Sequence, residues 1–330
     1  MWPRLLQLMK SDACACTGAS PDRVRYRERS TGEIHTEQVP AERWLRWLYW
    51  TRSGRVCAPG LFVPGLISTL LGWWQKSRWS RRDIRRFAAL HGVNLDEMAD
   101  PPAQLDSFNA FFTRRLKPGV RSFAAEPDVL CSPADGRALV FPCLNDGMDF
   151  PVKGARVTPA ELLNDRELAA AYDRGAALVV RLAPVDYHRF HFIDDALARP
   201  SRDIAGRRDS VNPIAQRRVP TVFARNKRSV TPLETTGFGP VVQVEIGAFG
   251  VASIVQTYSA GPVARGQEKG YFQFGGSALV LLFRQDTIVF DKDLEVDSAA
   301  GLETRVRTGE QLGRALLPEG GAVQPGRDVR

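Results

Sequence analysis

The chain has 330 residues, 44% of them hydrophobic, which suffices for one large domain or two ordinary ones and excludes a disordered protein. Its five cysteines have no regular spacing, which argues against a secreted protein built on disulfides. Cys14 and Cys16 have no second Cys or His pair nearby, so we expect no metal site there. Arg4 and Lys10 interrupt an apolar run that is already too short for a signal peptide.

The net charge of +8 comes from one region. Residues 41–86 contain ten basic and two acidic residues, together with six of the seven tryptophans. Arginine beside tryptophan is typical of nucleic-acid sites and of contacts with anionic membranes. Residues 56–75 carry no charge, which favours a membrane, and Pro59 and Pro64 favour a segment lying in the interface rather than crossing it. An ordinary helical layer packed on the domain is the alternative.

The first third of the chain is predicted to be mostly helical. We expect residues 1–25 to be disordered and residues 26–118 to form a strand or hairpin, turning at Thr31-Gly32, and then helices. Ser80 and Asp83 have the spacing of a capping box for a helix that stops at Gly92. Ser107 is expected to cap a second short helix.

Beyond residue 118 the pattern changes to short strands. Residues 119–316 are predicted to form a β-rich core, followed by a flexible tail at residues 317–330. A helical insert starts with a capping box at Thr158 and Glu161 and runs toward Gly175. We therefore predict an α+β protein, with a helical membrane-associating segment on a sandwich or barrel-like core. The expected strands are VLCSPADGRALVF, ALVVRLAP, DYHRFHF, TVFARN, VVQVEIGAFGVASIVQ and YFQFGGSALVLLF.

Four polar residues in this core are candidates for chemistry. His188 and His191 share DYHRFHF, where they can line one site only if the strand bends or ends. Asp135 lies in an SPADG turn, and Ser277 follows two glycines inside an apolar run. Asp, His and Ser together can activate a hydroxyl nucleophile. The G-x-S-x-G elbow of many hydrolases is absent, because Leu279 occupies its last position.

A Gly-Ser bond near a base has another use. The serine hydroxyl can attack the preceding carbonyl, and a glycine there removes the steric block and permits a strained bend. The amide becomes an ester, β-elimination cuts the chain, and the resulting dehydroalanine hydrolyses to a pyruvoyl group. The glycines before Ser277 are then explained by reactivity rather than by stability.

Several motifs in a fixed order support this interpretation. They are SFNAFFTRRLKPGVRSF, CSPADGRALV, VKG at residues 152–154, DYHRFHF, FARNKRSV and GYFQFGGSALVLLF. Together they resemble the phosphatidylserine decarboxylase family over roughly residues 26–290. The TGEI segment and the GGS form resemble its second, non-mitochondrial branch. The resemblance implies a pyruvoyl-dependent lyase that is made as a zymogen and cuts itself.

The family's roles can be carried over by motif. Ser277 resembles the serine that becomes the pyruvoyl group, with cleavage between Gly276 and Ser277 into residues 1–276 and 277–330. His191 would take the Ser277 proton, Asp135 would orient His191, and His188 would serve decarboxylation. The resemblance implies that the pyruvoyl ketone forms a Schiff base with phosphatidylserine, releasing CO2 and phosphatidylethanolamine. It requires no metal or pyridoxal phosphate, and it implies a homodimer attached peripherally to the cytoplasmic face of the cell membrane.

Two departures from the family keep alternatives open. Ala278 stands where the family has Thr or Ser, and Asn226-Lys227-Arg228 stands where many members have NER. One alternative is a related pyruvoyl decarboxylase of a soluble aromatic amino acid. Another is a lipid-binding family member that is never processed, for which Ala278 is the support. Nucleic-acid binding is the least favoured reading, so we expect no nucleic-acid partner.

Overall fold

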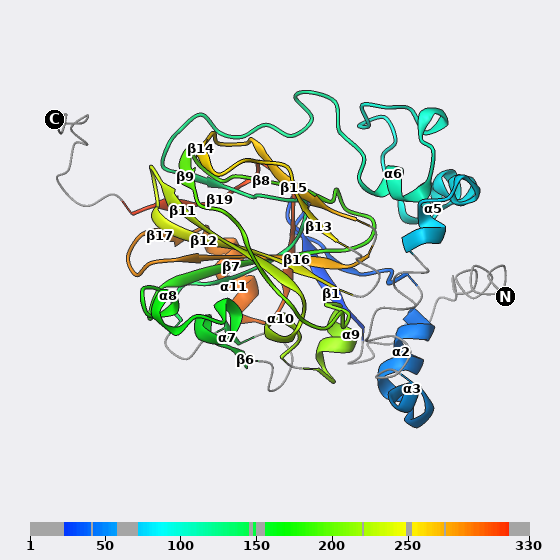
Figure 1. The fold of residues 1–330 in the computed structure, drawn as a ribbon, viewed down its shortest axis with the longest axis horizontal. Coiled ribbons are helices and arrows are strands. Elements are labelled where there is room, and N and C mark those ends of the chain that lie inside the picture. Colours follow the sequence, from blue (N-terminus) through cyan, green and yellow to red (C-terminus); the bar gives the residue numbers. More distant parts are fainter. Residues whose placement is uncertain are drawn as a thin grey trace.

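The structure is a computed structural model that describes residues 23–40, 42–57, 72–144, 148–149, 156–219, 221–248, 253–273 and 275–316. Of the residues 1–25 predicted to be disordered, 1–22 lie outside this range, as do most of the uncharged segment and the tail at 317–330. Arg25, the last of them, is instead the first residue of a strand. In the part that is described, no helix combines the length and the apolar character needed to cross a membrane. The α+β class is confirmed, with helices arranged around one large mixed sheet (Figure 1).

The large sheet has eleven strands and holds the strand that begins at Ser277 near its middle. Its order is β14-β9-β11-β12-β16-β7-β4-β18-β1-β2, with β10 added on β11. In this sheet the β1–β18 pair is parallel and the other strand pairs are antiparallel. The strands are β1 (Arg25–Glu28), β2 (Ile34–Thr36), β4 (Gly136–Phe141), β7 (Ala176–Leu182), β9 (Ala196–Ala198), β10 (Arg202–Ile204), β11 (Arg228–Thr235), β12 (Gly239–Gly247), β14 (Gly261–Val263), β16 (Ser277–Phe283) and β18 (Glu303–Val306).

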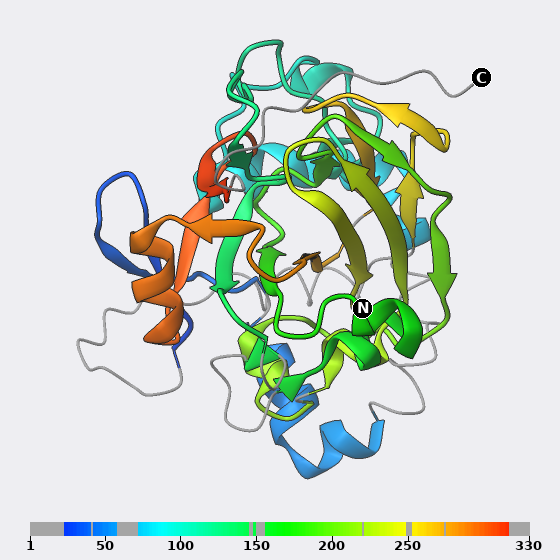
Figure 2. The same cartoon turned by 90° about the vertical axis from the view of Figure 1, so that its left-hand side faces the viewer.

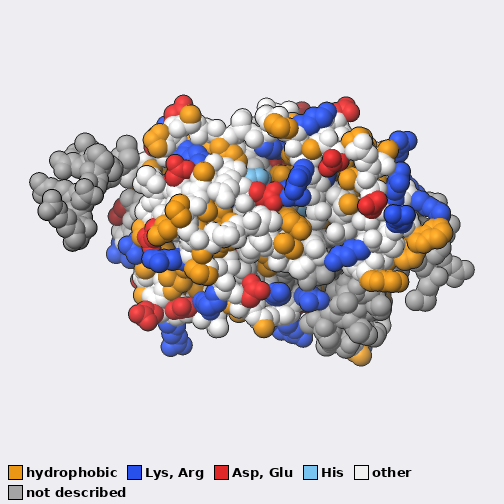
Figure 3. All heavy atoms as spheres, turned by 45° about the horizontal axis from the view of Figure 1, so that its top comes forward, with side chains coloured by type: hydrophobic (Ala, Val, Ile, Leu, Met, Phe, Trp, Pro, Cys, Tyr) orange, Lys and Arg blue, Asp and Glu red, His pale blue; other side chains and the backbone are white. Residues whose placement is uncertain are grey.

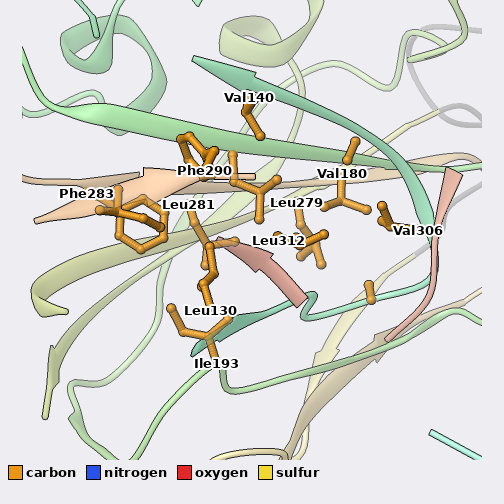
Figure 4. Close-up of a cluster of buried hydrophobic side chains, with 14 of the residues drawn as sticks. Leu130, Val140, Val180, Ile193, Leu279, Leu281, Phe283, Phe290, Val306 and Leu312 are labelled. Atoms are coloured by element: carbon orange, nitrogen blue, oxygen red, sulfur yellow. The ribbon is translucent and has the colours of Figure 1, made fainter. Parts of the chain in front are cut away.

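Two three-stranded sheets cover one face of the large sheet. Their orders are β13-β15-β8 and β17-β19-β3, and β5 (Met148–Asp149) and β6 (Arg156–Val157) form a separate pair. Alternate residues of β16, among them Leu279, Leu281 and Phe283, pack toward these smaller sheets (Figure 4). The strands of the smaller sheets are β3 (Val129–Cys131), β8 (Arg189–His191), β13 (Ile254–Gln256), β15 (Glu268–Phe272), β17 (Ile288–Phe290) and β19 (Gln311–Ala315).

Short helices cover the opposite face of the large sheet. Ala278, Val280 and Leu282 share a buried cluster with residues of α7, α8 and α10, so β16 is covered on both sides. Figure 2 shows these helices on one side of the strands, with α11 beside the β1–β2 hairpin. The helices are α2 (Glu42–Trp50), α3 (Arg52–Cys57), α5 (Ile84–His91), α6 (Phe108–Phe112), α7 (Pro159–Leu163), α8 (Arg166–Ala170), α9 (Pro213–Gln216), α10 (Val222–Arg225) and α11 (Lys292–Ala299), with 3-10 turns η2 (Arg78–Asp83) and η3 (Pro102–Gln104).

Several local predictions are confirmed and others are wrong. The hairpin turn, the Ser107 cap and the Thr158 capping box are present, and Gly92 ends α5 in a left-handed conformation. Ser80 caps no helix, because its hydroxyl contacts the carbonyls of Gln75 and Ser77 and accepts from Phe108 N. The TVFARN segment forms α10 rather than a strand, and the helical insert divides into α7 and α8 at a left-handed Asn164.

Candidate active site

Ser277 is the first residue of β16 and lies between two neighbouring strands. It pairs with Gly247 at the end of β12 and with Leu182 at the end of β7. It is fully buried, and its Oγ has no hydrogen-bond partner in the described part of the chain. By alternation from Leu279 its side chain faces the smaller sheets, one of which contains β8. A buried hydroxyl without a partner is costly, which keeps Ser277 a candidate for chemistry.

The two glycines before Ser277 play different roles. Gly275 has a φ of 140°, a conformation that residues with a Cβ rarely adopt, so glycine is required there. A Cβ on Gly276 would lie 3.7 Å from Val211 Cγ2 and 3.8 Å from Ala248 Cβ, which is ordinary contact. Both glycines lie in the connection between β15 and β16 rather than inside a strand. The sharp bend in front of the Gly276–Ser277 bond therefore depends on Gly275.

Asp135 lies at the same end of the sheet as Ser277. The register of β4 on β7 starts at Arg137 opposite Arg181, and Arg181 is the neighbour of Leu182, the β7 partner of Ser277. Asp135 directly precedes this end of β4. Asp135 and Ser277 therefore both lie where the neighbouring strands β4, β7, β16 and β12 begin or end, at the same end of these central strands.

Asp135 is a buried carboxylate with a full set of donors. Arg121 donates Nε–H to Oδ1 (3.0 Å) and an Nη2 proton to Oδ2 (2.7 Å). The amide and the hydroxyl of Thr308 both donate to Oδ1 at 2.8 Å. Burial alone would raise the pKa of Asp135, but the hydrogen bonds from Arg121 and Thr308 hold it below its usual value. The side chain is therefore ionised and fixed in place.

His191 is joined to Asp135 through the loop before β4. Its amide donates to the carbonyl of Pro133 at 2.9 Å, and its Nδ1 lies 3.4 Å from the same oxygen. Its ring lies near the rings of Tyr187 and Phe123, at centroid distances of 6.0 and 5.9 Å. Burial lowers the pKa of His191, while the Pro133 carbonyl and the negative charges of Glu268 and Asp135 act in the opposite direction. The imidazole is therefore neutral near pH 7 and available as a proton acceptor.

His188 lies just before β8 and is fully buried. Its Nδ1 is 2.9 Å from the carbonyl oxygen of Asp186, which can only accept, so Nδ1 carries the proton. Nε2 is then an unprotonated nitrogen, and it has no partner in the described part of the chain. The ring packs on Phe112 at 3.8 Å between centroids, and burial lowers its pKa to about 3. The carbonyl of His188 accepts from Phe272 N at 2.9 Å, next to the segment that leads to Ser277.

Asp135, His188 and His191 lie in one region, because the charge of Asp135 acts on both imidazoles and His191 is hydrogen-bonded to Pro133 of the Asp135 loop. Among the described residues, no hydrogen bond joins Asp135 to His191, or Ser277 Oγ to either histidine. His188 lies just before β8, which begins at Arg189, so the alternation along the strand does not set its direction relative to His191. The other two histidines lie elsewhere, His35 in β2 and His91 at the end of α5. In the residues that the structure covers, no cluster of His, Cys, Asp or Glu is arranged to hold a metal ion.

Sequence reasoning missed the residues that hold the candidates in place. Arg121 lies in one of the quoted motifs, but its pairing with Asp135 gives no sequence signal because the two are joined only in the fold. Thr308 is 173 residues from Asp135 and carries no signal in the sequence. Arg114 donates to the carbonyl of Asp186 at 3.3 Å, the oxygen that also contacts His188.

Comparison with known proteins agrees with the resemblance of the motifs. A family model described as phosphatidylserine decarboxylase matches residues 108–314. The chain belongs to the phosphatidylserine decarboxylase family. Relatives named phosphatidylserine decarboxylase proenzyme include those of Chlamydia caviae, 40% identical over 295 residues, and Ruminiclostridium cellulolyticum, 38% identical over 294. These alignments cover 89% of this chain, and 99% and 98% of the respective relatives.

The family match covers the candidate site. The matched range runs from α6, whose Phe112 touches His188, through β16 and into β19. It therefore contains all four candidate residues of this phosphatidylserine decarboxylase family member, together with Arg121 and Thr308. The name proenzyme, given to the relatives, describes proteins that are made in a precursor form.

Proposed function

We propose that this chain is a phosphatidylserine decarboxylase proenzyme that cuts itself between Gly276 and Ser277. The observation that carries the proposal is Ser277 itself, a buried serine with an unpartnered Oγ directly behind the bend at Gly275. Membership of the family supports phosphatidylserine as the substrate and phosphatidylethanolamine and CO2 as the products. We take residues 26–118 as the membrane-associating region and residues 119–316 as the catalytic core.

The cleavage begins with a proton transfer from Ser277. His191, neutral because of burial, accepts the Oγ proton, and the oxygen attacks the carbonyl carbon of Gly276. The negative charge of Asp135 stabilises the imidazolium that forms, and the loop through Pro133 keeps His191 oriented. The peptide C–N bond breaks to give an ester, and elimination releases Gly276 as a carboxylate. Water then replaces the nitrogen of the resulting dehydroalanine, which leaves as ammonia.

The surroundings of Ser277 fit the pyruvoyl group that this reaction would leave. Ser277 Oγ, which would leave with the Gly276 carboxylate, has no hydrogen bond to lose among the described residues, and the buried position excludes bulk water. When formed, the group supplies an electron sink for the loss of CO2. His188 starts without a proton on Nε2, so we propose that it first accepts one from the substrate ammonium and later gives it to the carbon that lost CO2. Phe112, packed on the ring, keeps this exchange away from solvent.

We further propose that the protein is a homodimer attached to the cytoplasmic face of the cell membrane. The support for attachment is the basic, tryptophan-rich region, in which Trp73 and Trp79 are exposed at 75% and 62%. A lipid substrate requires access to a membrane, which agrees with this region. The dimer rests on the family resemblance alone.

The deciding experiment is the intact mass of the purified protein under denaturing conditions. Cleavage at residues 276/277 should convert the 36.6 kDa chain into fragments of about 31 and about 6 kDa, the smaller with a blocked, ketone-bearing terminus. An intact chain that persists on incubation would refute self-processing and leave the unprocessed lipid-binding reading.

The division of roles between the histidines needs a second experiment. His191→Ala should block cleavage, whereas His188→Ala should cleave and then fail to decarboxylate phosphatidylserine in vesicles. The reverse pattern would overturn the assignment. Release of CO2 from a free aromatic amino acid, and not from phosphatidylserine, would instead identify the soluble-substrate alternative.

A further inference from the structure

A cavity lies on the surface between η2, α5 and η3, away from the strand ends that surround Ser277. It has a volume of about 360 Å³. Its polar lining is entirely cationic, with four arginines and no carboxylate. Its remaining wall is apolar, formed by Ile84, Pro102 and Ala103. The four arginines are Arg78, Arg81, Arg82 and Arg85.

These arginines are not used to hold the fold together. Arg78, Arg81, Arg82 and Arg85 are all exposed, and within the described residues no ion pair to a carboxylate is formed by any of them. The guanidinium of Arg82 lies 4.8 Å from the ring centroid of Trp79, which leaves its outer edge free to bind. Guanidinium groups bind phosphate through paired N–H donors. Four of them around one cavity therefore favour an anion such as phosphate.

The surroundings of the cavity favour a phosphate carried by a lipid. Trp79 stands beside the cavity, and Trp73 lies one helical turn before η2, both with exposed rings. Figure 3 shows Lys and Arg side chains beside hydrophobic ones at the end of the molecule that carries α5. Tryptophan at headgroup depth with arginine on the phosphates is the arrangement of an interfacial protein. A soluble phosphate compound would gain nothing from the exposed rings.

The cavity is connected to the candidate active site by packed aromatic rings. Ile84 of its wall belongs to the same buried cluster as Phe87, Phe108 and Phe112. Phe87 contacts Phe108 with ring centroids 5.2 Å apart, and Phe112 lies 3.8 Å from the ring of His188. A lipid held in the cavity would thus hold against the membrane a surface that is separated from His188 only by these packed aromatic rings.

We infer that this arginine cavity binds the phosphodiester of an anionic phospholipid that is not being decarboxylated, and so docks the protein on the membrane. The inference deepens the membrane attachment proposed above and rests on it. It is separate from the reaction at Ser277, because none of the lining residues belongs to that site.

The test measures binding to vesicles of a lipid that the enzyme cannot convert. Phosphatidylcholine vesicles with and without phosphatidylglycerol are sedimented with the full chain and with the triple variant Arg78→Gln/Arg81→Gln/Arg85→Gln. A charge-matched control carries Arg166→Gln/Arg284→Gln/Arg307→Gln, three arginines that are also exposed and lie outside the cavity. Because no reaction is measured, a failure of the proposed catalysis leaves the result readable.

The pocket variant should lose roughly 100-fold in partitioning onto phosphatidylglycerol vesicles, about 5-fold for each arginine. The control should lose much less, and soluble glycerol phosphate at matched concentration should not compete. Equal losses in both variants, or unchanged binding of the pocket variant, would overturn the inference. Competition by glycerol phosphate or inorganic phosphate would also overturn it, since the site would then serve a soluble ligand. An unchanged far-UV circular dichroism spectrum and an unchanged urea midpoint would show that the pocket variant folds.

Discussion

Lys269 and Glu245 form an ion pair that is entirely buried between β15 and the large sheet. Lys269 Nζ donates to Glu245 Oε1 at 2.8 Å and to Gln256 Oε1 at 3.0 Å, and Gln256 donates to Glu245 Oε2 at 2.8 Å. A register shift between Glu268 and Gly270 makes Lys269 the extra residue of a bulge. The bulge turns the Lys269 side chain inward. It lies between β15, which pairs with His191 of β8, and the large sheet, which contains Ser277.

Replacing Lys269 by Met should destabilise the fold by about 3 kcal/mol at pH 7. The variant leaves Glu245 buried without its cation, and burial already raises its pKa. The folded variant loses least stability if the Glu245 carboxylate takes up a proton. From the ordinary glutamate pKa of 4.5, this protonation costs about 3.4 kcal/mol at pH 7. Since the folded pKa is raised, this loss is absent below the unfolded pKa and grows as the pH rises. At pH 5 it should fall below about 1 kcal/mol.

The assay is urea unfolding at several pH values in a Ser277→Ala background, which keeps the chain in one piece. Adding Glu245→Gln to Lys269→Met should restore stability to within about 1 kcal/mol, because the new amide can still bond Gln256 without a buried charge. Lys292→Met is the matched control, since Lys292 pairs with Glu295 at 3.1 Å and is 83% exposed. Its loss should stay below about 1 kcal/mol. A pH-independent loss, or one no larger than the control's, would refute the reasoning.

Three further predictions concern the site and the two fragments. Arg121→Gln should lower the free energy of unfolding by about 2 kcal/mol at pH 7 and should slow cleavage. Because the pKa of Asp135 is held low in the folded protein, this loss should vanish as the pH falls below about 4. Urea unfolding at several pH values would check it. Gly275→Ala should cost about 1–3 kcal/mol from its φ of 140°, whereas Gly276→Ala, which has room for a Cβ, should cost less than about 1 kcal/mol in the same assay. After cleavage the fragments should co-elute on native size exclusion, because β16 stays paired on both sides; separate elution would contradict the topology.

Local chemistry explains which parts of the fold could be predicted. Ser107 and Thr158 cap helices through hydrogen bonds within three residues, so their sequence patterns suffice. Ser80 has the same kind of pattern, but its hydroxyl accepts from Phe108 N, 28 residues away, and the local prediction is wrong. TVFARN contains strand-forming residues and still forms a helix, because Val222 and Phe223 pack into the cluster on the helical face of the sheet.

The candidate site shows the same limit. Family motifs identified Ser277, Asp135, His188 and His191, whose roles stay predictions. The partners of Asp135 come from distant segments, and Lys269 reads in sequence as one more polar residue of a strand. A bulge reverses its direction, and no period-two pattern shows a bulge in advance. Tertiary pairing therefore decides which charged groups are buried beside the catalytic strands.

The position of the proposed cut follows from the way β16 is paired. Ser277 is the first residue of both ladders, whereas Gly276 lies outside them, so breaking the bond between them removes no pair from the sheet. The smaller fragment would retain seven register pairs with each neighbour in β16, and β18 would still lie between β1 and β4. Arg181, from the larger fragment, would also keep its buried contacts with Glu303 at 2.8 and 2.5 Å. The new terminus at Ser277 would thus stay buried at the start of β16, where it formed. A prosthetic group made from the chain requires such a fixed position.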